Sequence, residues 1–166
     1  MTTGNKAWKF GDDISTDHIA PGRLFHLRSN LQEFSKHVLE DADPEFAKNM
    51  TPGDFVVAGK NFGLGSSREH APQIIKIAGV QAVLAKSFAR IFFRNGINIG
   101  LPLVECNTDL INQGDELELD LKGGVVKNLT QNTEIKITPL PEVMMKILQD
   151  GGLAAHIEKY GDFKLD

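Results

Sequence analysis

A glycine-rich stretch, residues 59–70 with the sequence GKNFGLGSSREH, constrains the fold of this chain more than any other segment. An apolar run, residues 55–58, precedes it, and a segment with helically spaced apolar residues follows it. Glycine lets the backbone approach a ligand closely because it has no Cβ. A helix N-terminus offers free N–H groups and a partial positive charge. The stretch therefore predicts a strand, loop and helix that together bind an anion.

The segments around this loop alternate between strand and helix patterns. Apolar runs predict strands, and helical spacing predicts helices, in chain order at residues 7–10 (strand), 31–39 (helix), 55–58 (strand), 71–78 (helix), 82–85 (strand), 88–95 (helix) and 101–104 (strand). Ser29 or Asn30 would cap the first helix, Ser87 the third, and Gly79 would end the second. The succession predicts an α/β core with a parallel sheet and right-handed crossovers. Its glycine loop would lie at the C-terminal end of a strand, where such sheets bind ligands.

The remaining segments are of other kinds. Residues 11–18 are rich in Asp, Ser and Thr, which is typical of a loop. Residues 117–121, 125–126 and 135–137 alternate between apolar and polar side chains, which predicts a small antiparallel β layer with a glycine turn. A helical stripe over residues 143–148 stops at two glycines. We expect one domain over residues 1–166.

Composition excludes several classes of protein. The chain has 166 residues, of which 41% are hydrophobic and 24% charged, enough for one globular core. A net charge of −4 gives no basic surface of the kind that nucleic-acid-binding proteins carry. No apolar run approaches the roughly 20 residues of a membrane-spanning helix, and residues 1–6 lack the apolar core of a signal peptide. We expect a cytoplasmic protein without nucleic-acid or membrane partners.

Ser66 is the candidate for chemistry in the loop. A serine hydroxyl acts as a base or nucleophile when its anion is stabilised, and Ser67, Arg68 and a helix N-terminus are all adjacent. The alternative is that Ser66 or Ser67 only caps the helix, with Glu69 completing a capping box; the spacing favours neither. Nucleotide binding has less support, because the loop has neither a GxGxxG spacing nor a Walker ending.

Charged residues outside the loop are further candidates. Asp17 and His18 could form an acid/base or ion-paired couple, although an Asp-His dipeptide fits a solvated loop better. Arg28 could form the bidentate clamp that a carboxylate prefers. Arg90 and Arg94 share one face of a predicted helix, and such a face more often contacts solvent than a ligand.

The sequence indicates no metal site. The histidines that we expect to be structural or exposed show no metal-ligand spacing; they are His26, His37, His70 and His156. Cys106 is the single cysteine, which excludes an intramolecular disulfide. One thiol cannot hold an iron–sulfur cluster, which normally takes three or four thiolates. We expect Cys106 to pack as a small apolar side chain.

Three long motifs in order carry a resemblance to a known family. They are residues 12–19 (DDISTDHI), 59–72 (GKNFGLGSSREHAP) and 86–95 (KSFARIFFRN). Over nearly its whole length the chain resembles the small subunits of 3-isopropylmalate dehydratase and homoaconitase, which are equivalent to the swivelling domain of aconitase. The resemblance implies a swivelling β/β/α domain with a parallel central sheet, flanking helices and an accessory β layer.

The resemblance also implies a partner subunit and assigns separate catalytic roles to the two subunits. A large dehydratase subunit would hold a [4Fe–4S] cluster, whose iron would act as a Lewis acid on the departing hydroxyl of a 2-hydroxy di- or tricarboxylate. Ser66 is the implied base that removes a proton α to a carboxylate. Catalytic roles are implied for Ser66, Ser67, Arg68 and Asp17, and substrate binding for Arg28, Gly65 and His18. Asp17 would orient an arginine.

These features lead to one hypothesis with alternatives. The chain would be the small subunit of a hydro-lyase that isomerises 3-isopropylmalate in leucine biosynthesis. Arg28 departs from the apolar or neutral residue usual in isopropylmalate enzymes, and Leu64 stands where many of them have cysteine. An arginine suits a third carboxylate, so homoaconitase-, aconitase- and 2,3-dimethylmalate dehydratase-like enzymes are alternatives. A non-catalytic carboxylate-binding module is an alternative of another class. In isolation the chain could form a homo-oligomer.

Overall fold

Four parallel strands form the central sheet in the computed structural model, which describes residues 5–66 and 68–160. In sheet order they are β1 (Ala7–Lys9), β2 (Phe55–Val57), β3 (Ala82–Ala85) and β4 (Leu103–Glu105). The first connection contains α1 (Thr16–Ile19), the 3₁₀ segment η1 (Gly22–Ser29), α2 (Leu31–Ser35) and α3 (Phe46–Asn49). The second contains α4 (His70–Ala78) and the third α5 (Arg90–Asn98). Sheet order therefore equals chain order, as expected for consecutive strand–helix–strand units.

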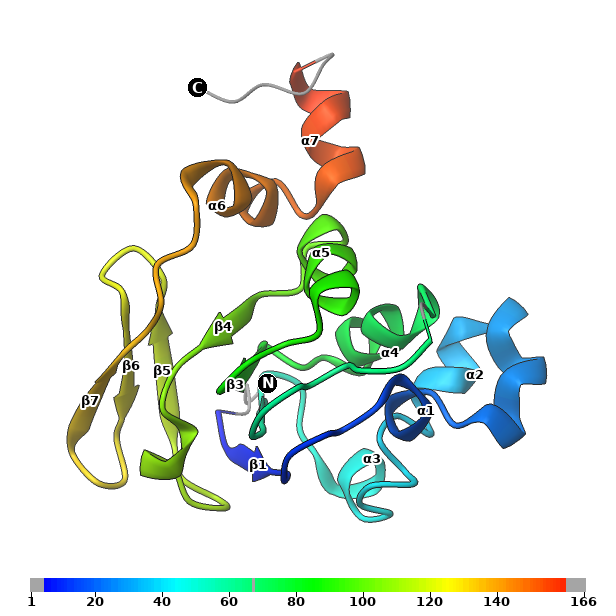
Figure 1. Cartoon of the computed structure of the whole chain (residues 1–166), viewed down its shortest axis with the longest axis horizontal. Helices are drawn as coiled ribbons and strands as arrows, with labels where there is room; N and C mark the ends of the chain where they lie inside the picture. Colours follow the sequence, from blue (N-terminus) through cyan, green and yellow to red (C-terminus); the bar gives the residue numbers. More distant parts are fainter. Residues whose placement is uncertain (1–4, 67, 161–166) are drawn as a thin grey trace.

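A second sheet covers the other face of the first. After the short 3₁₀ turn η2 (Thr108–Leu110), the chain forms β5 (Leu117–Asp120), β6 (Val125–Asn128) and β7 (Thr133–Lys136), which pair antiparallel in that order. In Figure 1 this sheet lies on one side of the parallel strands, and helices α1 to α5 lie on the other. The molecule thus has the predicted order of layers: helices, parallel sheet and small β layer.

Burial on both faces explains why the parallel strands are uniformly apolar. Val56 and Val83 point into the core shared with the helices. Their strand neighbours Phe55, Val57 and Leu84 point into the core shared with β5 to β7. Successive side chains of a strand alternate between faces, so each face requires apolar residues when both are covered. The sequence pattern of these strands is therefore a direct consequence of the three layers.

The predicted helix over residues 31–39 is wrong in its length. Asn30 caps the helix as predicted, with its side chain accepting a hydrogen bond from the backbone N–H of Glu33. Helix α2 nevertheless ends at Ser35, and turns follow. Leu39 adopts a φ of 58°, and its N–H donates to the carbonyl of Ile19 at 3.0 Å. A tertiary hydrogen bond therefore replaces helix propagation, while the Leu39 side chain stays fully buried.

Two further local predictions are corrected. The polar segment 11–18 is not entirely a loop, because α1 begins within it at Thr16. Helix α5 begins at Arg90 with Ala89 as its N-cap residue, and no side chain caps it. Ser87 instead accepts a hydrogen bond from the N–H of Asn61, 2.9 Å away. The Ser87 hydroxyl thus fixes the glycine loop rather than the helix.

Two helices complete the chain. α6 (Glu142–Gln149) matches the predicted stripe, and α7 (Leu153–Tyr160) follows after Gly151 and Gly152, both with positive φ. The sequence patterns did not predict α7. None of the helices in the described part of the chain has the length and apolar character needed to cross a membrane.

Candidate active site

The glycine loop lies between two other segments that hydrogen-bond to it. The N–H of Gly63 donates to the carbonyl of Ile14 at 2.7 Å, and the N–H of Thr16 donates to the carbonyl of Leu64 at 2.8 Å. On the opposite side, the N–H of Ala89 donates to the carbonyl of Phe62 at 2.9 Å. The three motifs singled out in the sequence therefore meet at one place. They meet beyond the C-terminal ends of β2 and β3, as the fold class predicts.

Two glycines in the loop are required by the backbone and by packing. Gly63 has a φ of 87°, and a Cβ there would lie 2.2 Å from Cγ of Phe92. Gly65 has a φ of 110°, and a Cβ would lie 3.2 Å from the hydroxyl oxygen of Thr16. Side chains other than glycine rarely adopt such φ values. The glycines thus let the loop pack directly against α5 and α1, which places Ser66 at the surface.

Ser66 is hydrogen-bonded to Arg68, and Arg68 is ion-paired with Asp17. Arg68 Nε donates to Ser66 Oγ at 3.1 Å, and Arg68 Nη1 donates to Asp17 Oδ1 and to the Ala20 carbonyl, both at 3.0 Å. Asp17 Oδ1 also accepts from the N–H of Gly22 at 3.1 Å. Because the Asp17 side chain is 65% exposed, its ion pair adds little stability. Its effect is to fix the direction of the Arg68 guanidinium toward Ser66.

The capping interpretation of Ser66 is wrong. Helix α4 begins at His70, and its N-cap residue is Glu69, with no hydrogen bond from a side chain. Ser66 lies before this point, and its carbonyl accepts from Thr16 Oγ1 at 3.0 Å. Its hydroxyl is an acceptor from a guanidinium, an arrangement that favours the anionic form of an alcohol. Ser67, the other predicted cap and catalytic neighbour, lies outside the described residues.

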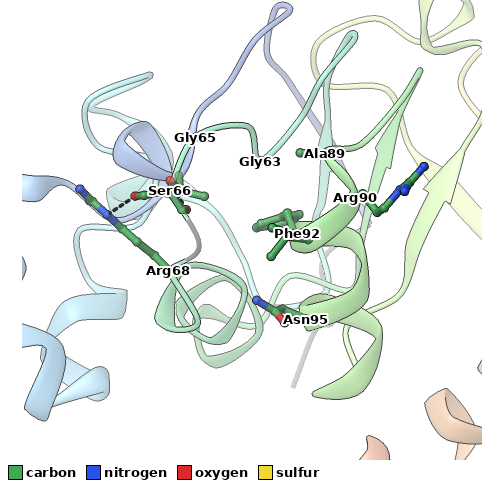
Figure 2. A pocket seen from close by; sticks show the side chains of 10 residues that line it. Gly63, Gly65, Ser66, Arg68, Ala89, Arg90, Phe92 and Asn95 are labelled. Atoms are coloured by element: carbon green, nitrogen blue, oxygen red, sulfur yellow. Dashed lines mark hydrogen bonds between the residues drawn. The ribbon is translucent and has the colours of Figure 1, made fainter.

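A cavity of about 200 Å³ opens between the loop and helix α5. Its walls include Gly63, Gly65, Ser66 and Arg68 on one side, and Arg90, Phe92 and Asn95 of α5 on the other. In Figure 2 Phe92 and Asn95 face the loop, whereas the Ser66 hydroxyl turns toward Arg68 and the Arg90 side chain points away from Ser66. The first-turn N–H groups of α5, which have no partner within a helix, belong to residues that line this cavity.

The predicted couple of Asp17 and His18 is not a direct pair. His18 Nδ1 lies 2.9 Å from both the N–H and the hydroxyl of Ser15, which completes a capping box around α1. Asp17 contacts Arg68 instead, as the family resemblance implied. The structure therefore gives His18 a local structural role at the start of α1. A contact of His18 with substrate stays a prediction.

Arg28 lies outside the cavity wall, and it contacts the same Phe25 ring as Arg68. Its Nη1 donates to the Phe25 carbonyl at 3.0 Å, and its Cζ lies 4.3 Å from the centre of the Phe25 ring. The Arg68 Cζ lies 5.9 Å from the same ring centre. Arg28 forms no ion pair with any residue of the described chain, so its guanidinium keeps donors for a ligand.

Among the groups with shifted pKa values, His70 and Cys106 bear on the candidate chemistry. Burial, assisted by the nearby Arg68 and Arg28 charges, lowers the pKa of His70. Burial raises the pKa of the Cys106 thiol to about 11. Cys106 is half-buried against the core of the antiparallel sheet, in keeping with the predicted packing role. Within residues 5–66 and 68–160, no group of three His, Cys, Asp or Glu side chains is arranged to hold a metal ion.

Sequence reasoning missed several residues of this site. Thr16, Phe92 and Asn95 were not singled out, and Arg90 was interpreted as part of a solvated helix face. Phe92 and Asn95 lie within the third motif, whose spacing indicates a helix but not which side faces the loop. The signal that could have found them is the glycine at position 63, which implies a large neighbour at close range.

Comparisons with known proteins agree with this arrangement. Residues 13–108 match the family model described as the aconitase C-terminal domain. The chain is 65% identical to 3-isopropylmalate dehydratase small subunit 2 of Archaeoglobus fulgidus, over 99% of this chain and all of that protein. It is 62% identical to small subunit 1 of the Thermotoga maritima enzyme, over 95% and 96% of the two chains.

A solved structure shares the fold as well as the sequence. The crystal structure titled 3-isopropylmalate dehydratase (LeuD) from Methanocaldococcus jannaschii superposes with a TM-score of 0.90 and 44% identity, covering 95% of this chain and 93% of that one. The match confirms the predicted α/β fold and the family resemblance drawn from the three motifs. This chain belongs to the aconitase C-terminal domain family, in the group of 3-isopropylmalate dehydratase small subunits.

Proposed function

We propose that this chain is the small subunit of a cytoplasmic two-subunit hydro-lyase that interconverts 2-isopropylmalate and 3-isopropylmalate in leucine biosynthesis, by dehydration and rehydration. The observation that carries the proposal is the Ser66 hydroxyl, which accepts a hydrogen bond from Arg68 while Asp17 fixes that arginine. The names of relatives more than 60% identical along nearly the whole chain support the substrate.

Ser66 has the surroundings of a base. In the proposed reaction its oxygen takes the proton from the carbon α to a substrate carboxylate, and the C–H electron pair enters the new double bond. The Arg68 guanidinium, 3.1 Å from that oxygen through Nε, favours the deprotonated hydroxyl before the transfer. Arg68 would also bind the carboxylate next to the reacting carbon by a charge-assisted hydrogen bond from Nη2, which has no hydrogen-bond partner among the described residues. In the rehydration that forms the isomer, Ser66 would give a proton to the carbon that lost its hydroxyl, and the hydroxyl would add to the carbon that lost its proton, which removes the double bond.

The chain's own residues do not fit a [4Fe–4S] cluster. Such a cluster needs three or four thiolates, whereas the chain has one cysteine, Cys106, whose pKa burial raises to about 11. We therefore assign the cluster to the large subunit, where it would supply Lewis-acid chemistry at the substrate hydroxyl. The small subunit contributes Ser66, Arg68 and Asp17, and substrate would be enclosed between the two chains.

The Ser66→Ala variant tests the catalytic assignment. Removing a general base typically lowers the rate by about 10²–10⁴-fold, so we expect a loss of that order in kcat when the variant is assembled with a cluster-bearing large subunit. The fold should be retained, because Ser66 is exposed and its hydroxyl contacts only Arg68 among the described residues. Ser29→Ala, an exposed serine without a described hydrogen bond, is the matched control. Full activity of Ser66→Ala would support the non-catalytic carboxylate-binding module instead.

A second candidate substrate is favoured by Arg28. Its guanidinium is exposed, lacks an ion pair in the described chain and lies beside the same ring as Arg68. A third carboxylate, as in homoaconitate or citrate, would satisfy it. Arg28→Val should then weaken the transition-state binding of a tricarboxylate by about 1.5–3 kcal/mol, the order of a hydrogen bond to a charged group, and spare 3-isopropylmalate. Comparing kcat/KM for the two substrates decides; equal losses would make Arg28 a general binding residue.

A further inference from the structure

Phe25 is a solvent-exposed aromatic residue on which two cations converge. Its side chain is 41% exposed in the 3₁₀ segment η1. The Arg28 guanidinium lies over the ring at 4.3 Å, and the Arg68 guanidinium lies within cation–π range at 5.9 Å. Arg28 also donates to the carbonyl of Phe25 itself. One residue therefore contacts Arg28 through both its ring and its backbone.

Aromatic contacts connect Phe25 to the buried core through His70 and Phe34. The Phe25 ring meets the His70 ring edge-on, with centroids 5.5 Å apart. His70 in turn stacks on Phe34, at 5.4 Å and an interplanar angle of 26°. Phe34 is fully buried in the main core. The contacts thus run without interruption from the core, through the first residue of α4, to an exposed arginine.

The polar part of His70 does not explain its position in this stack. Its Nε2 atom is shielded from solvent and has no hydrogen-bond partner among the described residues, an arrangement that costs stability. Burial, together with the neighbouring Arg68 and Arg28 charges, lowers the pKa of His70, which favours the neutral ring. What His70 supplies at this place is its flat ring rather than a proton or a hydrogen bond.

The segment that carries Phe25 is also fixed at both ends. Near its start, Arg23 pairs with Glu40 at 3.2 Å and with Asp41 at 2.9 Å. At its end, Asn30 caps α2. The φ/ψ values of Leu24 interrupt the 3₁₀ geometry between these points. Phe25 follows this kink, so its ring is directed onto His70 rather than continuing around a regular helix.

We propose that Phe25, seated on His70, is a positioning residue that holds the Arg28 guanidinium beside Arg68, so that the two arginines form one carboxylate-binding face. The inference rests on the proposed function, in which Arg68 binds one carboxylate of the substrate, and it extends that function to the third carboxylate of a tricarboxylate, which Arg28 would bind. Phe25 would act on substrate affinity through Arg28 and leave the proton transfer at Ser66 to Arg68 and Asp17.

A double-mutant cycle in the assembled two-subunit enzyme tests this role. We expect Phe25→Leu to raise the KM for the tricarboxylate homoaconitate by between about tenfold and a hundredfold, the equivalent of a lost hydrogen bond to a charged group, and to change kcat far less. In an Arg28→Val background the same change should add almost nothing, because Phe25 acts through Arg28. Leu129→Ala, an equally exposed apolar residue in the β6–β7 hairpin, is the control. Additive losses, or no loss in the single variant, would overturn the proposal.

Two variants at His70 distinguish the effect of its aromatic ring from the effect of its imidazole nitrogens. His70→Phe keeps an aromatic ring and should retain the KM of the parent enzyme, whereas His70→Ala should reproduce the loss seen with Phe25→Leu. If His70→Phe loses as much as His70→Ala, the imidazole nitrogen matters and the proposal is wrong.

A readout without turnover keeps the inference distinct from the proposed function. In nuclear magnetic resonance spectra of the full chain alone, the Arg28 Nε–H proton should be shifted upfield by the Phe25 ring relative to that of Arg90. The shift should vanish in Phe25→Leu and His70→Ala and persist in His70→Phe. A normal Arg28 signal in the parent chain would overturn the positioning role. If the Arg28 signal of the chain is shifted but the chain assembled with the large subunit shows no turnover, the proposed reaction is contradicted instead.

Discussion

At the scale of single residues, His70 makes the stability of the fold depend on pH near neutrality. Burial and the Arg68 and Arg28 charges lower its pKa, and only the Glu69 charge opposes them. The unfolded chain, with an ordinary histidine pKa near 6.5, therefore takes up a proton at a higher pH than the folded chain. Stability is fully present above about pH 6.5 and decreases as the pH falls through the lowered folded pKa.

We accordingly expect the free energy of unfolding to decrease between pH 7 and pH 5, and to decrease less in the His70→Phe variant. The carboxylates whose pKa values are lowered, such as Asp115 and Asp150, lose their contribution mainly below this window. Urea denaturation at closely spaced pH values measures the difference. Parallel profiles for the two proteins between pH 7 and pH 5 would show that His70 is not responsible.

Some residues of the candidate site could be selected from the sequence, whereas most of their contacts could not. Ser66, Arg68 and Asp17 could be selected because their side-chain chemistry and motif spacing appear directly in the sequence. The contact of Arg28 and Arg68 with one Phe25 ring depends on the kinked 3₁₀ geometry of η1. That geometry arises from ion pairs with residues 40–41 and from packing on His70, which are tertiary interactions that no local pattern records.

At the scale of elements, the glycine loop packs closely against helix α5 at Gly63. A Cβ at Gly63 would lie 2.2 Å from Phe92, and the φ of 87° is unfavourable for any other residue. Gly63→Ala should therefore lower the free energy of unfolding by roughly 2–5 kcal/mol, combining about 1–2 kcal/mol for left-handed backbone with about 1–3 kcal/mol for overpacking. Activity should also fall, because the loop carries Ser66.

Gly114 provides the matched control for this prediction. Its φ of 85° is almost the same, but a Cβ there meets nothing within 4 Å. Gly114→Ala should cost only the backbone contribution of about 1–2 kcal/mol. Equal losses in the two variants, measured by chemical denaturation, would show that contact with Phe92 does not require glycine.

Elements with strong periodic patterns were predicted well, but some of their ends were not. Strand β3 matches the predicted run at residues 82–85, and Gly79 ends α4 with a φ of 100° as expected. Helix α2 stops early because the Leu39 N–H bonds to Ile19, and Ser87 bonds to Asn61 rather than capping α5. In both cases a residue suited to a local helix makes a long-range hydrogen bond instead.

At the scale of the whole molecule, the parallel sheet joins the two cores. Each of its strands alternates between side chains packed with the helices and side chains packed with the antiparallel sheet. Removing either outer layer would expose one complete face of the sheet. We propose that the chain forms the single domain predicted from the sequence, because the layers within residues 5–66 and 68–160 depend on one set of strands for their burial.

The chain also lacks the ligands for the iron–sulfur cluster that the proposed reaction needs at the departing hydroxyl. Ser66, Arg68 and Asp17 can bind a carboxylate and move a proton, but one cysteine cannot hold a cluster. Purified alone and treated with ferrous iron and sulfide under reducing conditions, the chain should show no iron–sulfur absorption and no turnover. The large subunit should take up the cluster, and mixing the two should produce activity.

Cys106→Ser separates this expectation from an unforeseen role of the thiol. The side chain packs against the antiparallel sheet, in a different core from the residues around the glycine loop, and burial keeps its thiol protonated at neutral pH by raising the pKa to about 11. The variant should therefore match the parent chain in assembly, cluster content and kcat. A cluster formed on the small subunit alone, or one lost from the assembled enzyme in Cys106→Ser, would contradict the assignment of all cluster ligands to the partner.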